Sequence, residues 1–188
     1  MPPKNRTKDY IRGAYYHIYA RGVNKRKIFL NQSDYKAFLY RARSKNRGFV
    51  EINAYCLMPN HYHLLVQNKI ERGIEKYMRS LNTSYALFFN RKYDRVGHLF
   101  QGRYQAALIK TDAQLAATIN YIHQNPYKDR PETKTRYPYS SERNHTFEAG
   151  PSPQQDPQQD NVDNSATLDI LYPSQRQYAA PPGPSWEL

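Results

Sequence analysis

The sequence predicts an α+β fold, in which helices pack on a ferredoxin-like antiparallel sheet and one additional helix follows. Two observations predict it. Apolar residues alternate in short segments and recur at helical spacing in longer ones. These segments follow the order strand, helix, strand, strand, helix, strand, helix, whose first six members match the ferredoxin-like arrangement. We therefore expect one folded domain over residues 10–147 and a tail over residues 148–188.

The first four elements lie between residues 14 and 67. Residues 14–21 are rich in Tyr and Ile and predict a strand. Residues 33–44 predict a helix that Ser33 caps. Residues 49–57 and 61–67 predict two strands that pair as a hairpin, because Pro59-Asn60 between them is a turn signal.

The remaining elements include two helices. Residues 74–89 predict a long helix with apolar side chains at roughly helical spacing, and residues 91–95 a basic connector. Residues 104–109 predict the fourth strand. Thr111 with Gln114 matches a capping box, so a last helix should run from there to about Asn125, where Pro126 ends it.

The tail over residues 148–188 is rich in Pro, Gln, Asn, Ser and Asp and poor in apolar residues. Such a segment cannot bury enough apolar surface to offset its ordering entropy, so we expect it to be disordered. Its short apolar run at residues 168–172 is a candidate docking segment.

The charge is concentrated in the folded part. Up to Glu148 there are 27 Lys or Arg against 11 Asp or Glu, and the remaining residues carry a net charge of −4. A basic domain favours a polyanionic partner, and basic residues interleaved with 18 tyrosines suit a single-stranded nucleic acid. Some of these tyrosines should instead be half-buried strand residues. Charge alone does not distinguish DNA from RNA.

The sequence also indicates a cytoplasmic protein. Cys56 is the single cysteine, which fits a reducing compartment, and its apolar surroundings predict a buried small side chain rather than a nucleophile. The basic N-terminus lacks the apolar core of a signal peptide, and no segment approaches the roughly 20 apolar residues of a membrane span. We expect no membrane partner. A homodimer and a monomer are both compatible with the sequence.

His61 and His63 are two residues apart in a predicted strand, so their side chains point to the same face. Two adjacent imidazoles form a natural metal-binding pair, although an isolated pair of this kind is more often structural. The pair alone is an incomplete site, and a third ligand is needed.

Two stripes run along the last predicted helix. Leu115, Ile119 and Ile122 form an apolar stripe that should pack on the sheet. The neighbouring stripe is polar and comprises Gln114, Thr118, Tyr121 and Asn125. It could face the histidines, and the amide oxygen of Asn125 would suit a hard cation. On spacing alone, Tyr121 could equally be an amphipathic residue at the rim of the core.

Four segments resemble one family in the order expected there. They are NAYCLMPNHYHLLV at residues 53–66, MRSLNTSY at 78–85, GHLFQGRY at 97–104 and NYIHQNP at 120–126. Together they resemble the HUH-type single-tyrosine transposases, and most closely the REP-associated tyrosine transposase branch. The similarity extends over residues 17–130.

The resemblance implies a DNA-nicking and rejoining enzyme that acts on single-stranded or hairpin DNA. His61, His63 and Asn125 would hold a divalent metal, Mg²⁺ or Mn²⁺, and Tyr121 would be the nucleophile that forms a 5′-phosphotyrosine. In the wider family the position of Asn125 is often Gln. Two alternatives remain open: a non-catalytic DNA-hairpin-binding protein on the same fold, and a metal-dependent hydrolase that activates a water.

Basic residues around the predicted strands and helices are candidates for contacts with DNA phosphates. They are Arg21, Lys25, Arg26, Lys27, Arg91, Lys92, Arg95 and Arg103. The run Lys25 to Lys27 directly follows the first strand and is the preferred backbone clamp. His17, His98 and His123 are interpreted as structural or DNA-contacting residues rather than metal ligands.

Overall fold

Four strands form a single antiparallel sheet in the order β2-β3-β1-β4. The computed structural model describes residues 10–127 and 137–143. β1 (Tyr15–Arg21) pairs with β3 (His61–Asn68) on one side and with β4 (Gln105–Ile109) on the other, and β2 (Val50–Met58) pairs with β3. This is the ferredoxin-like strand order, so the predicted fold class is confirmed.

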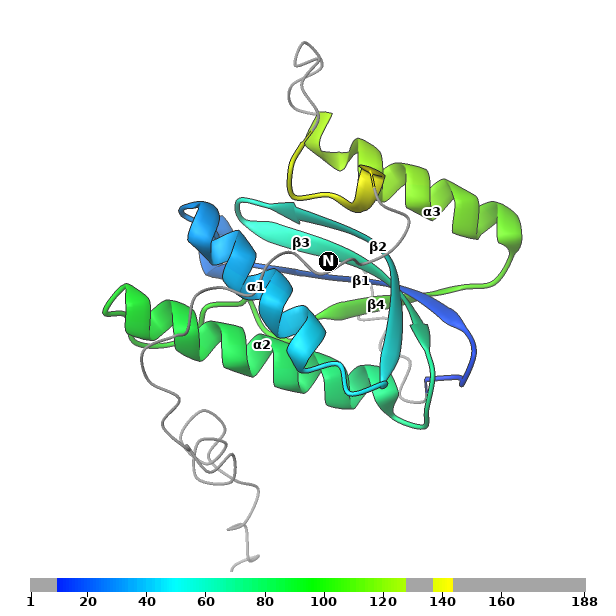
Figure 1. Cartoon of the computed structure of the whole chain (residues 1–188), viewed down its shortest axis with the longest axis horizontal. Coiled ribbons are helices and arrows are strands. Elements are labelled where there is room, and N and C mark those ends of the chain that lie inside the picture. Colours follow the sequence, from blue (N-terminus) through cyan, green and yellow to red (C-terminus); the bar gives the residue numbers. More distant parts are fainter. Residues whose placement is uncertain (1–9, 128–136, 144–188) are drawn as a thin grey trace, which may run out of the picture. The chain divides into compact units, whose positions relative to one another are not determined.

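The helices lie on both faces of the sheet (Figure 1). α1 (Gln32–Ser44) and α2 (Gly73–Lys92) cover one face, and α3 (Asp112–Gln124), the additional helix, covers the other. Short 3-10 helices of one turn each complete the described elements: η1 (Val23–Lys25), η2 (Asn125–Tyr127) and η3 (Ser141–Arg143). All described residues belong to one compact unit, Met1–Pro153.

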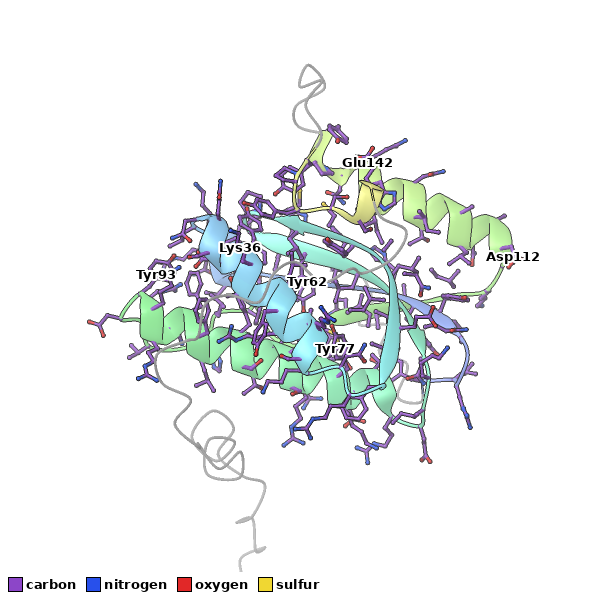
Figure 2. The ribbon with its side chains drawn as sticks, viewed as in Figure 1. Lys36, Tyr62, Tyr77, Tyr93, Asp112 and Glu142 are labelled. Carbon is purple, nitrogen blue, oxygen red and sulfur yellow. The ribbon has the colours of Figure 1, made fainter. Side chains whose placement is uncertain are left out.

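Strand alternation divides the apolar side chains between the two faces. Ile18, Tyr62 and Leu64 are buried against α1 and α2, together with Tyr77 from α2; Figure 2 labels the two tyrosines. Leu65 points the other way and packs with α3 in a smaller cluster. The residues that share the face of Leu65 by alternation include both histidines of β3.

The first helix begins one residue earlier than the sequence predicts. Its N-cap is Asn31 and not Ser33, because the Asn31 side chain accepts hydrogen bonds from the amides of Ser33 and Asp34. Asp34 in turn accepts from the Asn31 amide at 3.2 Å, which completes a capping box. At α3 the predicted cap Thr111 is confirmed, since its hydroxyl accepts from the Gln114 amide. The reciprocal half of the predicted capping box differs, because the Gln114 side chain accepts from the Lys110 amide and not from that of Thr111.

The predicted basic connector at residues 91–95 is wrong in its first part, because α2 continues to Lys92. The side chain of Lys92 forms an ion pair of 2.6 Å with Asp34, which is fully buried. Asp34 also accepts a hydrogen bond from the Tyr93 hydroxyl at 2.8 Å. These contacts fasten the end of α2 to the start of α1 and extend the helix beyond Phe89.

A segment far along the chain completes the edge of the sheet at β2. Ser140 forms a bridge with Cys56, and the Leu57 amide donates to the Tyr139 carbonyl at 2.9 Å. His123 of α3 shares a 3.0 Å hydrogen bond with Ser141. The segment therefore holds the C-terminal end of α3 against β2, and Glu142 lies beside that end in Figure 2.

Residues 148–188 lie outside the described residues. The predicted disorder of this tail, its apolar run at residues 168–172 and the predicted domain boundary at 147/148 therefore stay predictions. Within the described part of the chain, no helix combines the length and the hydropathy that a membrane crossing requires.

Candidate functional site

The two histidines of β3 stand side by side on the face that α3 covers. Their ring centroids are 5.0 Å apart and the rings are nearly perpendicular, at 89°. His63 is only 6% exposed, whereas His61 at the start of the strand is more accessible. The sequence-based expectation that both imidazoles share one face is therefore confirmed.

Asn60 fixes the orientation of His61. The Nδ1 atom of His61 lies 2.6 Å from the Oδ1 atom of Asn60. The Asn60 amide group donates in turn to the Lys25 carbonyl at 3.4 Å. Asn60 belongs to the β2–β3 turn, so the hairpin itself orients the first imidazole.

His17 of β1 contacts the second imidazole. Its Nε2 atom lies 2.9 Å from Nδ1 of His63. In the antiparallel register Tyr19 is the direct cross-strand partner of His63. His17 lies two residues before Tyr19 in β1, opposite Leu65, and so is diagonal to His63 on the same face. Burial lowers the pKa of His17 from 6.5 to about 4, because a charged ring is poorly solvated there. At neutral pH the ring is therefore uncharged.

Tyr121 of α3 lies over the same group of imidazoles. Its ring centroid is 5.7 Å from that of His63 and 5.7 Å from that of His17, edge to face in both cases. The side chain is 41% exposed. It is held there because Ile122, the next residue, is fully buried against the sheet, and Leu115 and Ile119 pack beside it. The expected meeting of the polar helix stripe with the paired histidines is thus found.

A cavity of about 750 Å³ opens between α3 and the strands β1 and β4. Its polar lining comprises His17, Tyr19, His63, Gln114, Thr118 and Tyr121. Three of the four residues of the predicted polar stripe therefore line it. The cavity gives a substrate access to the Tyr121 ring and to His63 from the open side.

Asn125, the fourth residue of that stripe, lies one turn beyond Tyr121 where η2 contacts β2. It is 8% exposed, and its Nδ2 atom has no hydrogen-bond partner among the described residues. This atom is a hydrogen-bond donor, so its missing partner would be an acceptor and not a cation. The role of Asn125 as a metal ligand stays a prediction.

The donor set fits a divalent cation of the kind the family resemblance implies. Two imidazole nitrogens and an amide oxygen are acceptable ligands for Mn²⁺ or Mg²⁺. The described residues contain no cluster of three or more His, Cys, Asp or Glu side chains able to hold a metal. A cation here would thus depend on His61, His63, Asn125 and oxygen atoms from water or a substrate phosphate.

Part of the predicted basic set gathers at the His61 end of the sheet. Arg21 is the cross-strand partner of His61. The exposed residues Lys25, Arg26 and Lys27 follow in the turn that packs on the β2–β3 hairpin, where the Ile28 amide donates to the Pro59 carbonyl at 2.8 Å. These four cations therefore lie at the end of the sheet that carries His61.

The other predicted DNA contacts are more dispersed. Arg91 and Arg103 are exposed. The Arg95 guanidinium lies 5.5 Å above the Phe89 ring, and Lys92 is engaged by Asp34. A phosphate contact by Lys92 would compete with that ion pair. Of the other histidines, His98 is exposed and His123 is bound to Ser141.

Sequence reasoning did not assign a role at this site to Asn60, His17 or Tyr19. Alternation along β1 puts His17 and Tyr19 on one face of that strand. Their position beside His63 depends on the register between two strands that are far apart in sequence, which no local pattern contains. Asn60 was recognised only as a turn residue.

The chain belongs to the family of IS200-like transposases, whose family model matches residues 10–125. The matched range includes every element from β1 to α3 and every candidate site residue. The family resemblance seen in the sequence motifs is therefore confirmed, and the chain belongs to a class of DNA-processing transposases.

Two relatives give this result more detail. A Haemophilus influenzae protein that carries the name REP-associated tyrosine transposase is 26% identical over 156 residues, which cover 73% of this chain and 84% of that protein. A solved structure of a REP-associated tyrosine transposase bound to a REP hairpin is 17% identical and aligns with a TM-score of 0.54. The alignment covers 83% of this chain and 96% of that one, so the two share a fold.

Proposed function

We propose that this protein is a single-tyrosine transposase that nicks and rejoins single-stranded DNA through a 5′-phosphotyrosine at Tyr121. The observation that carries the proposal is the contact of the Tyr121 ring with His63, at a centroid separation of 5.7 Å, beside an open cavity. Hairpin-forming repeat DNA is the proposed substrate, because the structural relative is bound to a REP hairpin.

Covalent catalysis by Tyr121 accounts for both cutting and rejoining. The phenol oxygen would form a bond to phosphorus while the bond from phosphorus to the 3′ oxygen breaks. The leaving 3′ oxygen takes up a proton, and the phenol loses one. The phosphotyrosine retains the ester bond, so attack by a 3′ hydroxyl can reverse the reaction without an external energy source.

His61, His63 and Asn125 would hold the divalent cation. When bound, the cation would supply Lewis-acid polarisation of a non-bridging phosphate oxygen and stabilise the leaving oxygen. The protein side chains would orient the scissile phosphate between the imidazoles and the phenol. The Tyr121 ring is 41% exposed at this position, so it would be accessible to that phosphate.

Replacing Tyr121 by Phe tests the nucleophile. With an end-labelled hairpin in Mn²⁺ buffer, the variant should bind DNA with nearly unchanged affinity and should lose cleavage and the covalent adduct. Tyr19→Phe is the matched control, because Tyr19 lines the same cavity and is 40% exposed. Undiminished cleavage by Tyr121→Phe would exclude the mechanism. Cleavage by the wild-type protein without an adduct would favour a hydrolase that uses water.

Replacing His61 and His63 together by Ala tests the metal site. The double variant should lose Mn²⁺-stimulated cleavage while it retains salt-sensitive DNA binding. Cleavage by the double variant that still responds to Mn²⁺ would show that other residues hold the cation.

A further inference from the structure

The tautomers of the two paired histidines depend on residues outside the proposed ligand set. A neutral imidazole carries a proton on one nitrogen and a lone pair on the other, and only the lone pair can bind a metal. The side chains that contact the Nδ1 atoms of His61 and His63 therefore decide which nitrogen is a ligand.

For His61 the contact with Asn60 determines the tautomer. An amide oxygen has no proton to donate, so the 2.6 Å contact between Nδ1 and Oδ1 requires a proton on Nδ1 of His61. The Asn60 amide group donates to the Lys25 carbonyl, which agrees with this assignment of its oxygen. In the neutral ring the lone pair then lies on Nε2.

For His63 the partner is a second imidazole. The rings of His17 and His63 are inclined by only 26°, and their centroids are 5.1 Å apart. Rings stacked at that separation could not bring two of their nitrogens to 2.9 Å, so the rings meet edge to edge in nearly one plane. This is the geometry of a linear hydrogen bond between nitrogens, and one ring must donate to the other.

We propose that His17 is a positioning residue that accepts the Nδ1 proton of His63 and thereby keeps the Nε2 lone pair of His63 available for the cation. The proposal rests on the proposed function, in which His63 binds a metal. The Nε2 atom of His17 is the nitrogen that faces His63, and it accepts in the neutral tautomer that carries its proton on Nδ1. His17 thus does for His63 what Asn60 does for His61, and both imidazoles present the same nitrogen.

Ligand histidines generally donate their second nitrogen to a fixed acceptor, and loss of that acceptor costs about 10-fold to 100-fold in metal affinity. His17→Leu removes the acceptor and replaces the imidazole with an apolar side chain of similar width. His17→Gln is the matched control, because its amide oxygen can reach the position of Nε2 and accept the same proton.

The first measurement needs neither a metal nor a variant of His17. Long-range proton–nitrogen NMR spectra of the metal-free protein, labelled with ¹⁵N-histidine, should show His63 protonated on Nδ1 at mildly alkaline pH. The His63 signals are assigned by their loss in His63→Gln. A proton on Nε2 of His63 would overturn the proposal, because His17 would then be the donor.

The second measurement is Mn²⁺ affinity, determined by calorimetry on the full chain without DNA. We expect His17→Leu to bind Mn²⁺ about 10-fold to 100-fold more weakly, and His17→Gln to stay close to wild type. Wild-type affinity in His17→Leu would overturn the proposal. A wild-type protein that binds no Mn²⁺ would remove the metal from the proposed function and with it the role of His17, even with His63 protonated on Nδ1.

Discussion

Arg21 of β1 and His61 of β3 are cross-strand partners at one end of the sheet. Directly opposed side chains of an antiparallel pair point to the same face, so Arg21 stands on the face of the paired imidazoles. Its Nε atom donates to Oε1 of Gln101 at 2.8 Å, which restrains the guanidinium group. A restrained cation at this position suits a contact with a DNA phosphate under the proposed function.

Arg21→Gln should therefore weaken the binding of hairpin DNA without changing sequence preference. Loss of one phosphate contact should reduce the slope of log affinity against log salt by about 1. Arg47→Gln is the control, since exposed Arg47 precedes β2, whose first residue Val50 pairs with Asn68 at the far end of β3. Equal losses in both variants would mean that only net charge matters.

Gly22 should not tolerate a side chain. A Cβ atom there would lie 2.1 Å from the Arg26 carbonyl oxygen and 2.9 Å from a methyl group of Ile28. Gly22→Ala should lower the free energy of unfolding by about 1–3 kcal/mol, as overpacking does, and displace the turn that carries Lys25 to Lys27. Urea denaturation and DNA titration measure the two effects. Wild-type values in both would contradict this close packing.

Cys56 should be unreactive in the folded protein. Burial, together with the nearby Glu142 carboxylate, raises the pKa of its thiol to about 12. The thiolate is the reactive form, so it should be scarce at mildly alkaline pH. A thiol reagent should label Cys56 only after denaturation in guanidinium chloride. Rapid labelling of the native protein would show that the segment 137–143 does not cover β2 in solution.

Lys92→Met should reduce stability more than DNA affinity. The change leaves the buried carboxylate of Asp34 without its cation, although the Leu30 amide and the Tyr93 hydroxyl still donate to it. We expect a loss of about 1–3 kcal/mol in the free energy of unfolding. Lys27→Met is the control, because it removes the same charge from an exposed turn. It should weaken DNA binding and leave the free energy of unfolding nearly unchanged. Strong loss of DNA binding with unchanged stability in Lys92→Met would make Lys92 a DNA contact.

Local patterns in the sequence were sufficient for most of the fold. Alternation along the strands put His61 and His63 on one face, and helical spacing separated the polar stripe of Tyr121 from the apolar stripe of Ile122. The cap of α3 was also correct. The cap of α1 was not, because both Asn31 and Ser33 are good capping residues and only the backbone conformation decides between them.

The parts that could not be predicted depend on contacts between distant segments. The register of β1 against β3 places His17 beside His63, and no spacing within either strand encodes it. The pairing of Ser140 with Cys56 and the burial of Asp34 by Lys92 are likewise decided by tertiary packing. The family resemblance therefore supplied the candidate nucleophile and ligands, and local pattern placed them on their elements, but neither identified the residues that contact them from other strands and turns.

The most direct test of the central claim is mass spectrometry of the covalent adduct after reaction with a hairpin in which the fragment on the 3′ side of the cut is short. We expect the nucleotide mass on the peptide that contains Tyr121, joined through a 5′ phosphate, with a free 3′ hydroxyl on the other product. An adduct on Tyr19 or on another tyrosine, or cleavage products with a free 5′ phosphate and no adduct, would contradict the claim.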